Sequence, residues 1–171
     1  MAAQEEVDLV DDKDSVIGVA SLRDCLERGL LHRAVAVIVE QADGSVLLQR
    51  RSTRDLWNPG LWTLSCTGHV KKGENYRQAA SRELLEELGL RSPLRSIWKL
   101  KLPQIRDRSL IEHEWVSVFR TRTEVEPTLD PAELSAVKEV NRAELLKIAK
   151  GRSLAEDARI LIRRYLETNP N

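Results

Sequence analysis

Three glutamates on one short segment, Glu83, Glu86 and Glu87, are the residues of this chain best suited to chemistry. If the segment is helical, their spacing of three and four positions places the carboxylates on one face. Like charges at this spacing destabilise a helix by roughly 0.2–0.5 kcal/mol each unless a cation lies among them. Carboxylate oxygens are also the ligands that Mg²⁺ and Mn²⁺ take beside substrate phosphates. The cluster predicts a metal site, and the alternative is a solvated acidic face on an ordinary helix.

The residues around these glutamates carry the signals of a helix. Glu74 and Asn75 suit a helix start, and Gly89 suits a C-terminal cap. No proline or glycine interrupts residues 74 to 88, and apolar residues recur at every fourth position. These apolar residues are Tyr76, Ala80, Leu84 and Leu88. The pattern predicts an amphipathic helix whose apolar stripe packs on the core.

Residues 68–90 read GHVKKGENYRQAASRELLEELGL, and they fill every fixed position of the Nudix box. That box is G-x5-E-x7-R-E-U-x-E-E-x-G-U, in which U is aliphatic. On this segment the chain resembles the Nudix hydrolases. The resemblance implies an α/β fold, namely a Nudix-type α/β/α sandwich with a mixed β-sheet. It also implies a reaction in which water attacks a phosphorus of a substituted diphosphate in the presence of Mg²⁺, with Mn²⁺ as the alternative ion.

The resemblance assigns roles within the box. Glu83 and Glu87 would be the main metal ligands, together with the carbonyl of Gly68, and Glu86 would hold a further ion or a coordinated water. These three glutamates are therefore also the expected catalytic residues. Arg82 and Glu74 correspond to the structural ion pair of the family, which braces the loop against the helix.

Length and composition agree with this reading. A chain of 171 residues predicts one domain over residues 1–171, in which residues 1–30 form an N-terminal extension. The 27 basic and 27 acidic residues balance, which argues against a nucleic-acid partner. Two cysteines, Cys25 and Cys66, provide no disulfide framework. No apolar run approaches about eighteen residues, and the N-terminus is acidic, so we expect a cytoplasmic protein with no membrane contact.

The remaining elements follow from periodicity and turn signals. Hairpins are predicted in two places, and the second has Asp-Gly at its tip. Two further strands follow the box, then a short strand and two helices joined by Gly151. The predicted strands are Val7–Val10, Val16–Leu22, Ala34–Glu40, Ser45–Gln49, Arg95–Leu102, Leu110–Arg120 and Val137–Val140, and the predicted helices are Asn141–Lys150 and Leu154–Thr168.

The segments that flank the box narrow the resemblance. Leu-His-Arg-Ala at residues 31–34 and LLQRRSTRDLWNPGLWTLSCTGHV at residues 47–70 resemble the Nudix branch that includes type I isopentenyl diphosphate isomerase. The resemblance extends from about residue 7 to about residue 120. It places His32, His69, Glu112 and Glu114 at four of the five isomerase metal-ligand positions. It also makes Glu114 the carboxylate that would take part in proton transfer.

Several residues depart from the isomerase pattern. The isomerase cysteine immediately precedes the Gly-His pair, where this chain has Thr67, and Cys66 comes one residue early. On an extended strand that slip points the thiol to the opposite face. Cys25 stands at the fifth ligand position. The expected tyrosine is absent from Leu102–Arg108, and no tryptophan follows Trp115. The box also keeps Glu83 and Glu86, where isomerases are degenerate, so the departures favour hydrolysis.

Each of these residues has a plainer interpretation. His32 can be structural, and His69 can merely position the box loop. Glu112 and Glu114 share one face of a strand and can be a solvated edge. Cys66 can be a small buried residue.

Basic and aromatic residues surround the segment between two predicted strands. Arg50, Arg51 and Arg54 suit a substrate diphosphate because guanidinium groups match phosphate oxygens, although a basic strand end is the alternative. Trp57 and Trp62 can be core anchors or a wall on which a ligand stacks, and we favour packing.

The sequence therefore predicts a Mg²⁺-dependent hydrolase of a substituted diphosphate, such as a nucleoside diphosphate derivative. An isopentenyl diphosphate isomerase with a displaced cysteine is the alternative, and a ligand-sensing domain without catalysis is a third hypothesis. The partner is a small diphosphate. A homodimer is expected as an option, with the predicted strand Val16–Leu22 as its pairing edge.

Overall fold

The structure is a computed structural model that describes residues 5–130 and 134–169. Eleven strands and four helices make up the described chain. In chain order they are β1 (Glu6–Val10), β2 (Val16–Ser21), α1 (Leu22–Arg28), β3 (His32–Glu40), β4 (Val46–Arg51), β5 (Trp62–Thr63), β6 (Cys66–His69), α2 (Tyr76–Leu88), β7 (Arg95–Lys101), β8 (Ile105–Asp107), β9 (Leu110–Glu112), β10 (Glu114–Arg122), β11 (Leu134–Val140), α3 (Arg142–Ile148) and α4 (Glu156–Thr168).

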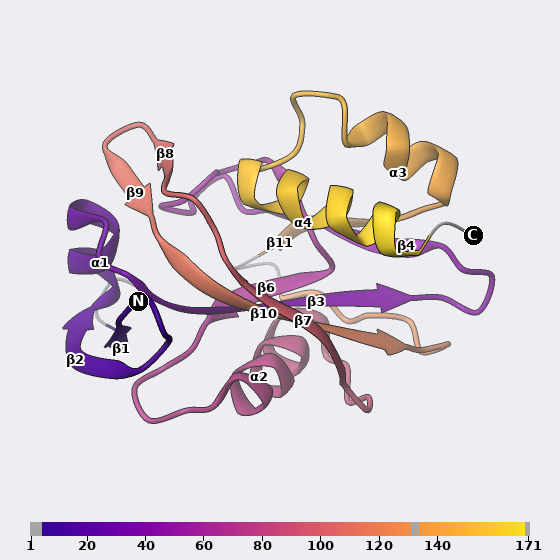
Figure 1. The fold of residues 1–171 in the computed structure, drawn as a ribbon. Helices are drawn as coiled ribbons and strands as arrows, with labels where there is room; N and C mark the ends of the chain where they lie inside the picture. Colours follow the sequence, from indigo (N-terminus) through magenta and orange to yellow (C-terminus); the bar gives the residue numbers. More distant parts are fainter. Residues whose placement is uncertain (1–4, 131–133, 170–171) are drawn as a thin grey trace.

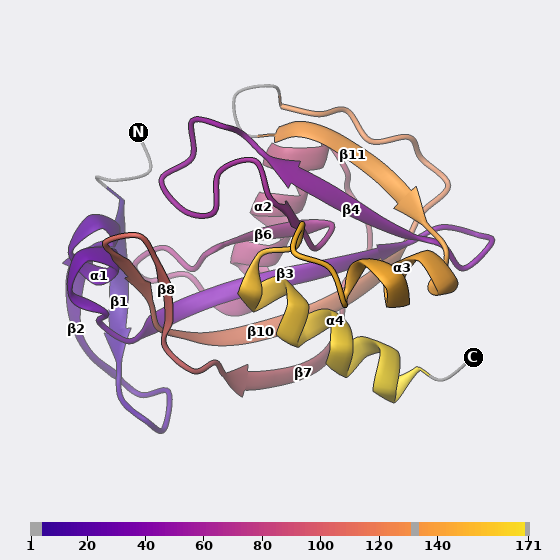
Figure 2. The ribbon, with the colours of Figure 1, turned by 90° about the horizontal axis from the view of Figure 1, so that it is seen from above.

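A mixed sheet of nine strands forms the middle layer, with α2 on one face and α3 and α4 on the other (Figure 1). The long strand β3 lies at its centre, where it pairs in parallel with β10 and antiparallel with β6. Seen from above, α4 crosses over β3 and β10 (Figure 2). Strands β8 and β9 form a separate hairpin. The predicted α/β/α sandwich with a mixed sheet is confirmed.

The core has two halves, one on each face of the sheet. Strand β3 is therefore buried on both faces, as expected of a central strand with a parallel neighbour. Ala34, Ala36 and Ile38 face α4 and pack with its apolar stripe. Val35 and Val37 belong to the other half, which contains the apolar residues of α2. Side chains of β3 and its neighbours therefore alternate between an α2 face and an α4 face, and this alternation decides where each functional residue points.

Helix α2 begins at Tyr76, two residues later than the first start signal. Asn75 is the N-cap and forms a capping box with Gln78, which satisfies two backbone donors at the helix start. Glu74 lies outside the helix, where its carboxylate accepts a hydrogen bond from the Lys71 amide at 3.1 Å. Gly89 ends the helix with φ of 66°, a left-handed conformation that glycine adopts without strain.

Several predicted boundaries were wrong. The predicted strand Leu110–Arg120 is two strands, β9 and β10, separated at His113. The strand predicted to end at Leu22 ends at Ser21, which caps α1, a helix that the sequence analysis did not predict. The short strands β5 and β6 were also not predicted. Strands β5 and β6 depend on pairing with strands distant in the sequence, so local periodicity does not reveal them.

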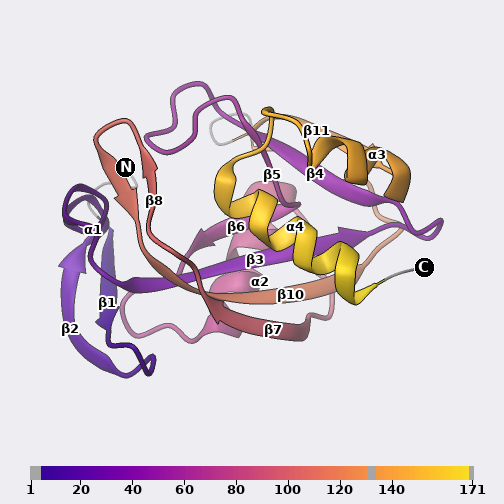
Figure 3. The same ribbon diagram turned by 45° about the horizontal axis from the view of Figure 1, so that its top comes forward.

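The N-terminal hairpin leaves β2 as an outer strand, which among the described strands pairs with β1 alone (Figure 3). Val16, Ile17 and Val19 are 53%, 68% and 42% exposed. Unpaired strand edges with apolar side chains are sites of strand addition. The homodimer through this strand stays a prediction.

One buried carboxylate, Asp14, holds the hairpin against the sheet. It accepts from Arg33 at 2.6 Å, from Lys99 at 2.6 Å and from the Tyr76 hydroxyl at 3.0 Å, so it joins β3, β7 and α2. Burial raises its pKa, but the hydrogen bonds from Lys99 and Arg33 outweigh burial and lower the pKa of Asp14. Its φ of 62° is one that Asp and Asn tolerate.

We expect Asp14→Asn to lower the free energy of unfolding at pH 7 by about 1.5–3 kcal/mol, because charged hydrogen bonds become neutral ones. A carboxyl whose folded pKa is lowered stabilises the fold above its unfolded pKa, so the deficit should shrink as pH falls from about 5 to about 3. Urea unfolding at several pH values measures this. Asp12→Asn removes an exposed partner of Lys101 in the same turn and should change stability little. A deficit independent of pH would contradict the account.

Candidate active site

The three glutamates of the box lie on α2 and differ in burial. Glu83 and Glu87 are buried at 8% and 6% exposure, whereas the Glu86 side chain is half exposed. Two buried carboxylates and one accessible carboxylate therefore share a helix face. The amide of Thr67 on β6 donates to Glu87 at 3.2 Å, which fixes the helix against that strand.

Gly68 on β6 lies directly against the Glu83 side chain of α2. A Cβ atom at this position would lie 2.2 Å from Cδ of Glu83 and 2.3 Å from its Oε1. Only glycine leaves room for a carboxylate directly against the strand backbone. The glycine that the sequence analysis placed among the metal ligands thus stands beside the Glu83 carboxylate, as a shared ligand set requires.

Arg82 lies among the acids and neutralises them in part. Its guanidinium contacts Glu74 at 2.8 Å, Glu83 at 2.6 Å and Glu86 at 3.1 Å, and it donates to the His69 carbonyl at 3.0 Å. Burial opposes its charge, but these acids raise the pKa of Arg82. The predicted Arg82–Glu74 pair is in contact, and Arg82 is also the cation that permits acids at i, i+3 and i+4.

Glu87 stays protonated near neutrality in the chain without a cation. Burial, with the nearby charge of Glu83, raises its pKa to about 8. The Cys66 thiol and the charge of Arg51 act in the opposite direction. A cation bound at this face would have to displace that proton.

A second group of ligands lies around the start of β3. Nitrogen or oxygen atoms of His32, His69, Glu112 and Glu114 all lie within 4.8 Å of one another. We call these four residues the His–Glu cluster. His32 Nε2 is 3.3 Å from Glu112 Oε1, and His69 Nε2 is 3.5 Å from Glu114 Oε1. All but His69 are buried, so the predicted solvated edge is wrong for Glu112 and Glu114.

The tautomer of His32 prepares the cluster for a cation. Nδ1 of His32 is 2.9 Å from the Leu30 carbonyl, so Nδ1 carries the proton and Nε2 keeps its lone pair. Nε2 of His32 and Oε1 of Glu112 are buried and make no hydrogen bond within the described chain. Two imidazoles and two carboxylates, one imidazole held by a backbone carbonyl, fit Mn²⁺ or Zn²⁺.

The two carboxylates of the cluster titrate in opposite directions. Burial alone would raise both pKa values. The adjacent His32 and His69 instead lower the pKa of Glu112, whereas burial and the charge of Glu112 hold the pKa of Glu114 well above its usual range. One ionised and one protonated carboxyl side by side can accept and deliver a proton.

Residues 66 to 69 of β6 separate the two groups. Thr67 and His69 pair with Ala36 and Ala34, which face α4, so they point toward the His–Glu cluster. Cys66 pairs with Val37 and is fully buried in the α2 half of the core. The expected reversal of the cysteine is therefore present, and the thiol lies beneath α2.

The three arginines behave differently. Arg51 is part-buried, lies 3.2 Å from Asp55, and its charge acts on both Glu87 and Glu114. Arg50 is exposed and donates to the Gly60 carbonyl at 2.8 Å. Arg54 is exposed as well. Of the three, Arg51 is the one that the structure places between the two groups of acids.

The aromatic residues of the same region fill the protein. Trp57 is buried at 5% exposure, and Trp62 is half-buried against the α4 half of the core. Lys138 stacks on the Trp62 ring at 4.7 Å. Packing therefore accounts for both, as favoured from the sequence.

Sequence reasoning missed one acid near the cluster, Asp157 in the first turn of α4. Its charge acts on Glu114, and the charges of Arg51 and Glu112 act on it. In the sequence it stands beside Glu156 at a helix start, where acids complement the helix dipole, so nothing marked it as special. Only the packing of α4 on the sheet brings it to the site.

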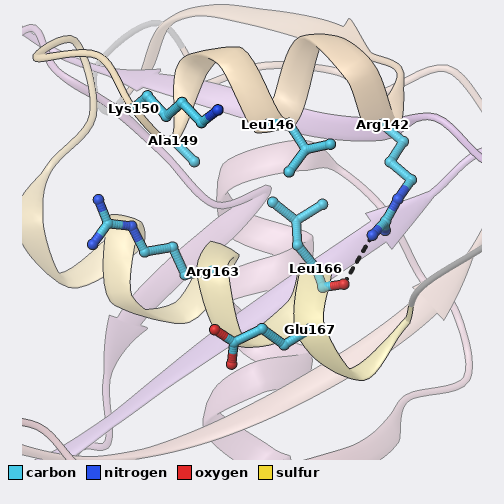
Figure 4. A pocket seen from close by; sticks show the side chains of 7 residues that line it. All are labelled: Arg142, Leu146, Ala149, Lys150, Arg163, Leu166 and Glu167. Atoms are coloured by element: carbon cyan, nitrogen blue, oxygen red, sulfur yellow. Dashed lines mark hydrogen bonds between the residues drawn. The ribbon is translucent and has the colours of Figure 1, made fainter.

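A separate hollow lies between α3 and α4 (Figure 4). Its lining includes Arg142, whose guanidinium donates to the Leu166 carbonyl at 2.9 Å, and none of its residues belongs to either acidic group.

Among the described helices, none is long and apolar enough to cross a membrane.

Comparison with known families decides the family. A family model described as NUDIX domain matches residues 30–164. The chain belongs to the NUDIX family. The Nudix chain is 40% identical over 140 residues to isopentenyl-diphosphate Delta-isomerase 2 of Photorhabdus laumondii, which covers 82% of this chain and 77% of the relative. It is 29% identical over 159 residues to an uncharacterized Nudix hydrolase of Pseudomonas aeruginosa, covering 92% and 91%.

Solved structures agree on the fold of this Nudix chain. A protein of Deinococcus radiodurans superposes with a TM-score of 0.78 at 24% identity, covering 94% of this chain and 98% of that one. A protein of Methanosarcina mazei, called MutT, gives a TM-score of 0.69 at 22% identity, covering 82% and 96%.

We expect Gly68→Ala to weaken Mg²⁺ binding on the order of 10-fold or more, because the new methyl group displaces Glu83. Isothermal titration with Mg²⁺ measures it. Gly18→Ala is the matched control, since its Cβ meets nothing closer than 3.8 Å. Equal affinities in wild type and Gly68→Ala would exclude a metal at this face.

Mg²⁺ should raise the melting temperature more at about pH 8.5 than at about pH 6, because binding requires the Glu87 carboxylate. Without metal, stability should fall as pH rises from about 4.5 to about 8, since the folded chain keeps a proton that the unfolded chain releases. Thermal scans at several pH values check both statements. Glu87→Gln should flatten both dependences, and an unchanged pH profile in that variant would assign them to another group.

Proposed function

We propose that the protein hydrolyses a substituted diphosphate by attack of water on phosphorus, with Mg²⁺ or Mn²⁺ as cofactor. One observation carries the proposal: the position that faces the His–Glu cluster holds Thr67, whereas the Cys66 thiol is buried beneath α2. Protonation of a carbon–carbon double bond by that thiol is therefore not available. The complete set of box glutamates supports the same conclusion.

The residues of the chain divide the work. Arg51, between the two acidic groups, binds the diphosphate oxygens. Glu86 is the accessible box glutamate and accepts a proton from the attacking water. Arg82 holds Glu83 in place and, through the His69 carbonyl, fixes the loop before α2.

The box face and the His–Glu cluster each fit a divalent cation. Glu83, Glu87 and the Gly68 carbonyl would hold Mg²⁺ at the box, since Gly68 leaves space for the Glu83 carboxylate. When bound, the cation acidifies water and offsets negative charge on the phosphoryl oxygens. Glu114 lies in the His–Glu cluster and would be a ligand of the cation bound there.

Isopentenyl diphosphate isomerisation is the second candidate, and the His–Glu cluster together with the 40% identity to a named isomerase favours it. In that reaction the paired Glu112 and Glu114 would move a proton at carbon. Thr67 would then stand where the isomerase cysteine acts, which leaves the opposite face of the double bond without a thiol.

One NMR experiment separates the two candidates. The protein with Mg²⁺ is given isopentenyl diphosphate in D₂O, and separately a panel of nucleoside diphosphate derivatives, and ¹H and ³¹P spectra follow both. We expect phosphorus signals of hydrolysis products and no deuterium in the isoprenoid. Glu86→Gln should lower the hydrolysis rate on the order of 10²-fold or more.

Deuterium entering an intact isoprenoid diphosphate would reject hydrolysis as the main activity. Cys66→Ala serves as the control, because it should abolish an isomerase that uses the thiol and leave a hydrolase active.

A further inference from the structure

One oxygen atom beside the His–Glu cluster has no partner in the described chain. It is Oδ1 of Asp157, which is buried and makes no hydrogen bond there. A buried acceptor without a partner costs about 1–3 kcal/mol, and more when charged. Such an atom in a native fold points to a bound group that supplies the donor.

Backbone contacts fix the start of α4 beside the sheet. The Trp62 amide donates to the Ser153 carbonyl at 2.9 Å, and the Ala155 amide donates to the Trp62 carbonyl at 2.9 Å. The position of Asp157, two residues after Ala155, is therefore set by β5 rather than by a free helix end.

The packing of the next residue gives the direction. Ala158 is fully buried in the core half that contains Ala34 and Ala36. These two alanines pair with His69 and Thr67 of β6. The first turn of α4 thus lies on the same face of the sheet as the His–Glu cluster.

A second polar atom of this region also lacks a hydrogen bond. Oγ1 of Thr67 is buried and makes none in the described chain, whereas Nε of Arg51 lies 3.2 Å from Oδ2 of Asp55. Arg51, Thr67 and Asp157 come from β4, β6 and α4. Burial raises the pKa of both Glu114 and Asp157. The charge of Asp157 adds to the rise at Glu114, and the charge of Arg51 opposes the rise at Asp157.

We propose that Asp157 is a specificity-determining residue, whose Oδ1 accepts a hydrogen bond from a hydroxyl group on the substituent joined to the diphosphate. This inference rests on the proposed function and names its substrate class: hydroxylated substituents, such as the ribose of a nucleoside diphosphate. A hydrocarbon substituent would leave the buried oxygen unpaired, which sites of this kind reject strongly.

Helix capping explains only part of this side chain. Backbone N–H groups of Asp157 and Ala158 act on the carboxylate, as is usual in a first helical turn. Oδ1 still has no donor. A capping role predicts an effect on stability alone, whereas a hydroxyl contact predicts an effect on the choice of substrate.

The test compares a ribonucleoside diphosphate with its 2′,3′-dideoxy counterpart. We expect wild type to prefer the ribonucleotide in kcat/KM, and Asp157→Leu to reduce that preference on the order of 10–100-fold, the loss expected for a charged hydrogen bond. Asp157→Asn should keep part of it, because an amide oxygen still accepts. Glu156→Gln alters the exposed neighbouring acid, which pairs with Arg159, and should leave the preference unchanged.

Calorimetric affinities for the same two nucleotides, and melting temperatures of every variant, accompany the kinetics. Equal effects of Asp157→Leu and Asp157→Asn on both nucleotides, or a change in melting temperature alone, would overturn the inference and leave hydrolysis standing. Failure of wild type to cleave any diphosphate would reject the proposed function instead. In that case the role of Asp157 would be decided by calorimetry: tighter binding of the ribonucleotide than of its dideoxy counterpart, lost in Asp157→Leu, would support it, and equal binding would reject it.

Discussion

The alternation of side chains along β6 is the constraint on which the rest of the site depends. Four consecutive residues serve two faces: Cys66 packs beneath α2, Thr67 and His69 face the His–Glu cluster, and Gly68 leaves space for Glu83. Antiparallel pairing with β3 holds this register, and a slip by one residue would reverse every assignment. The backbone of this short strand therefore lies between the two ligand groups.

Acids gathered so closely require compensation, and two arginines provide most of it. Arg82 contacts three carboxylates of the box loop and helix, which lets like charges share one helix face. Arg51 acts from β4 on buried acids of both groups. Burial, together with the like charges of Glu83 and Glu112, still raises the pKa values of Glu87 and Glu114. The protonation of these two carboxyl groups is what a bound cation or a substrate phosphate would change.

The chain shares 40% identity with a named isomerase, and the alternation along β6 is the feature that supports the proposal of hydrolysis instead. The His–Glu cluster is common to both readings, because imidazole and carboxylate ligands serve either chemistry. On this face the chain carries a threonine on β6, where the isomerase pattern has cysteine, and an acid on α4, Asp157. The proposed preference for a hydroxylated substrate rests on the second of these residues.

The sequence by itself determined the box helix, the ligand groups and the α/β sandwich. Fixed spacing within one helix dictates which carboxylates share a face, so Glu83, Glu86 and Glu87 could be grouped without coordinates. It also showed that Cys66 must point away from Thr67, since strand periodicity is two. Only the tertiary structure decided three facts: that Glu112 and Glu114 are buried, that Arg51 is the arginine that acts on both groups of acids, and that Asp157 lies near the site. Those facts depend on contacts between distant strands and helices, which no local pattern encodes.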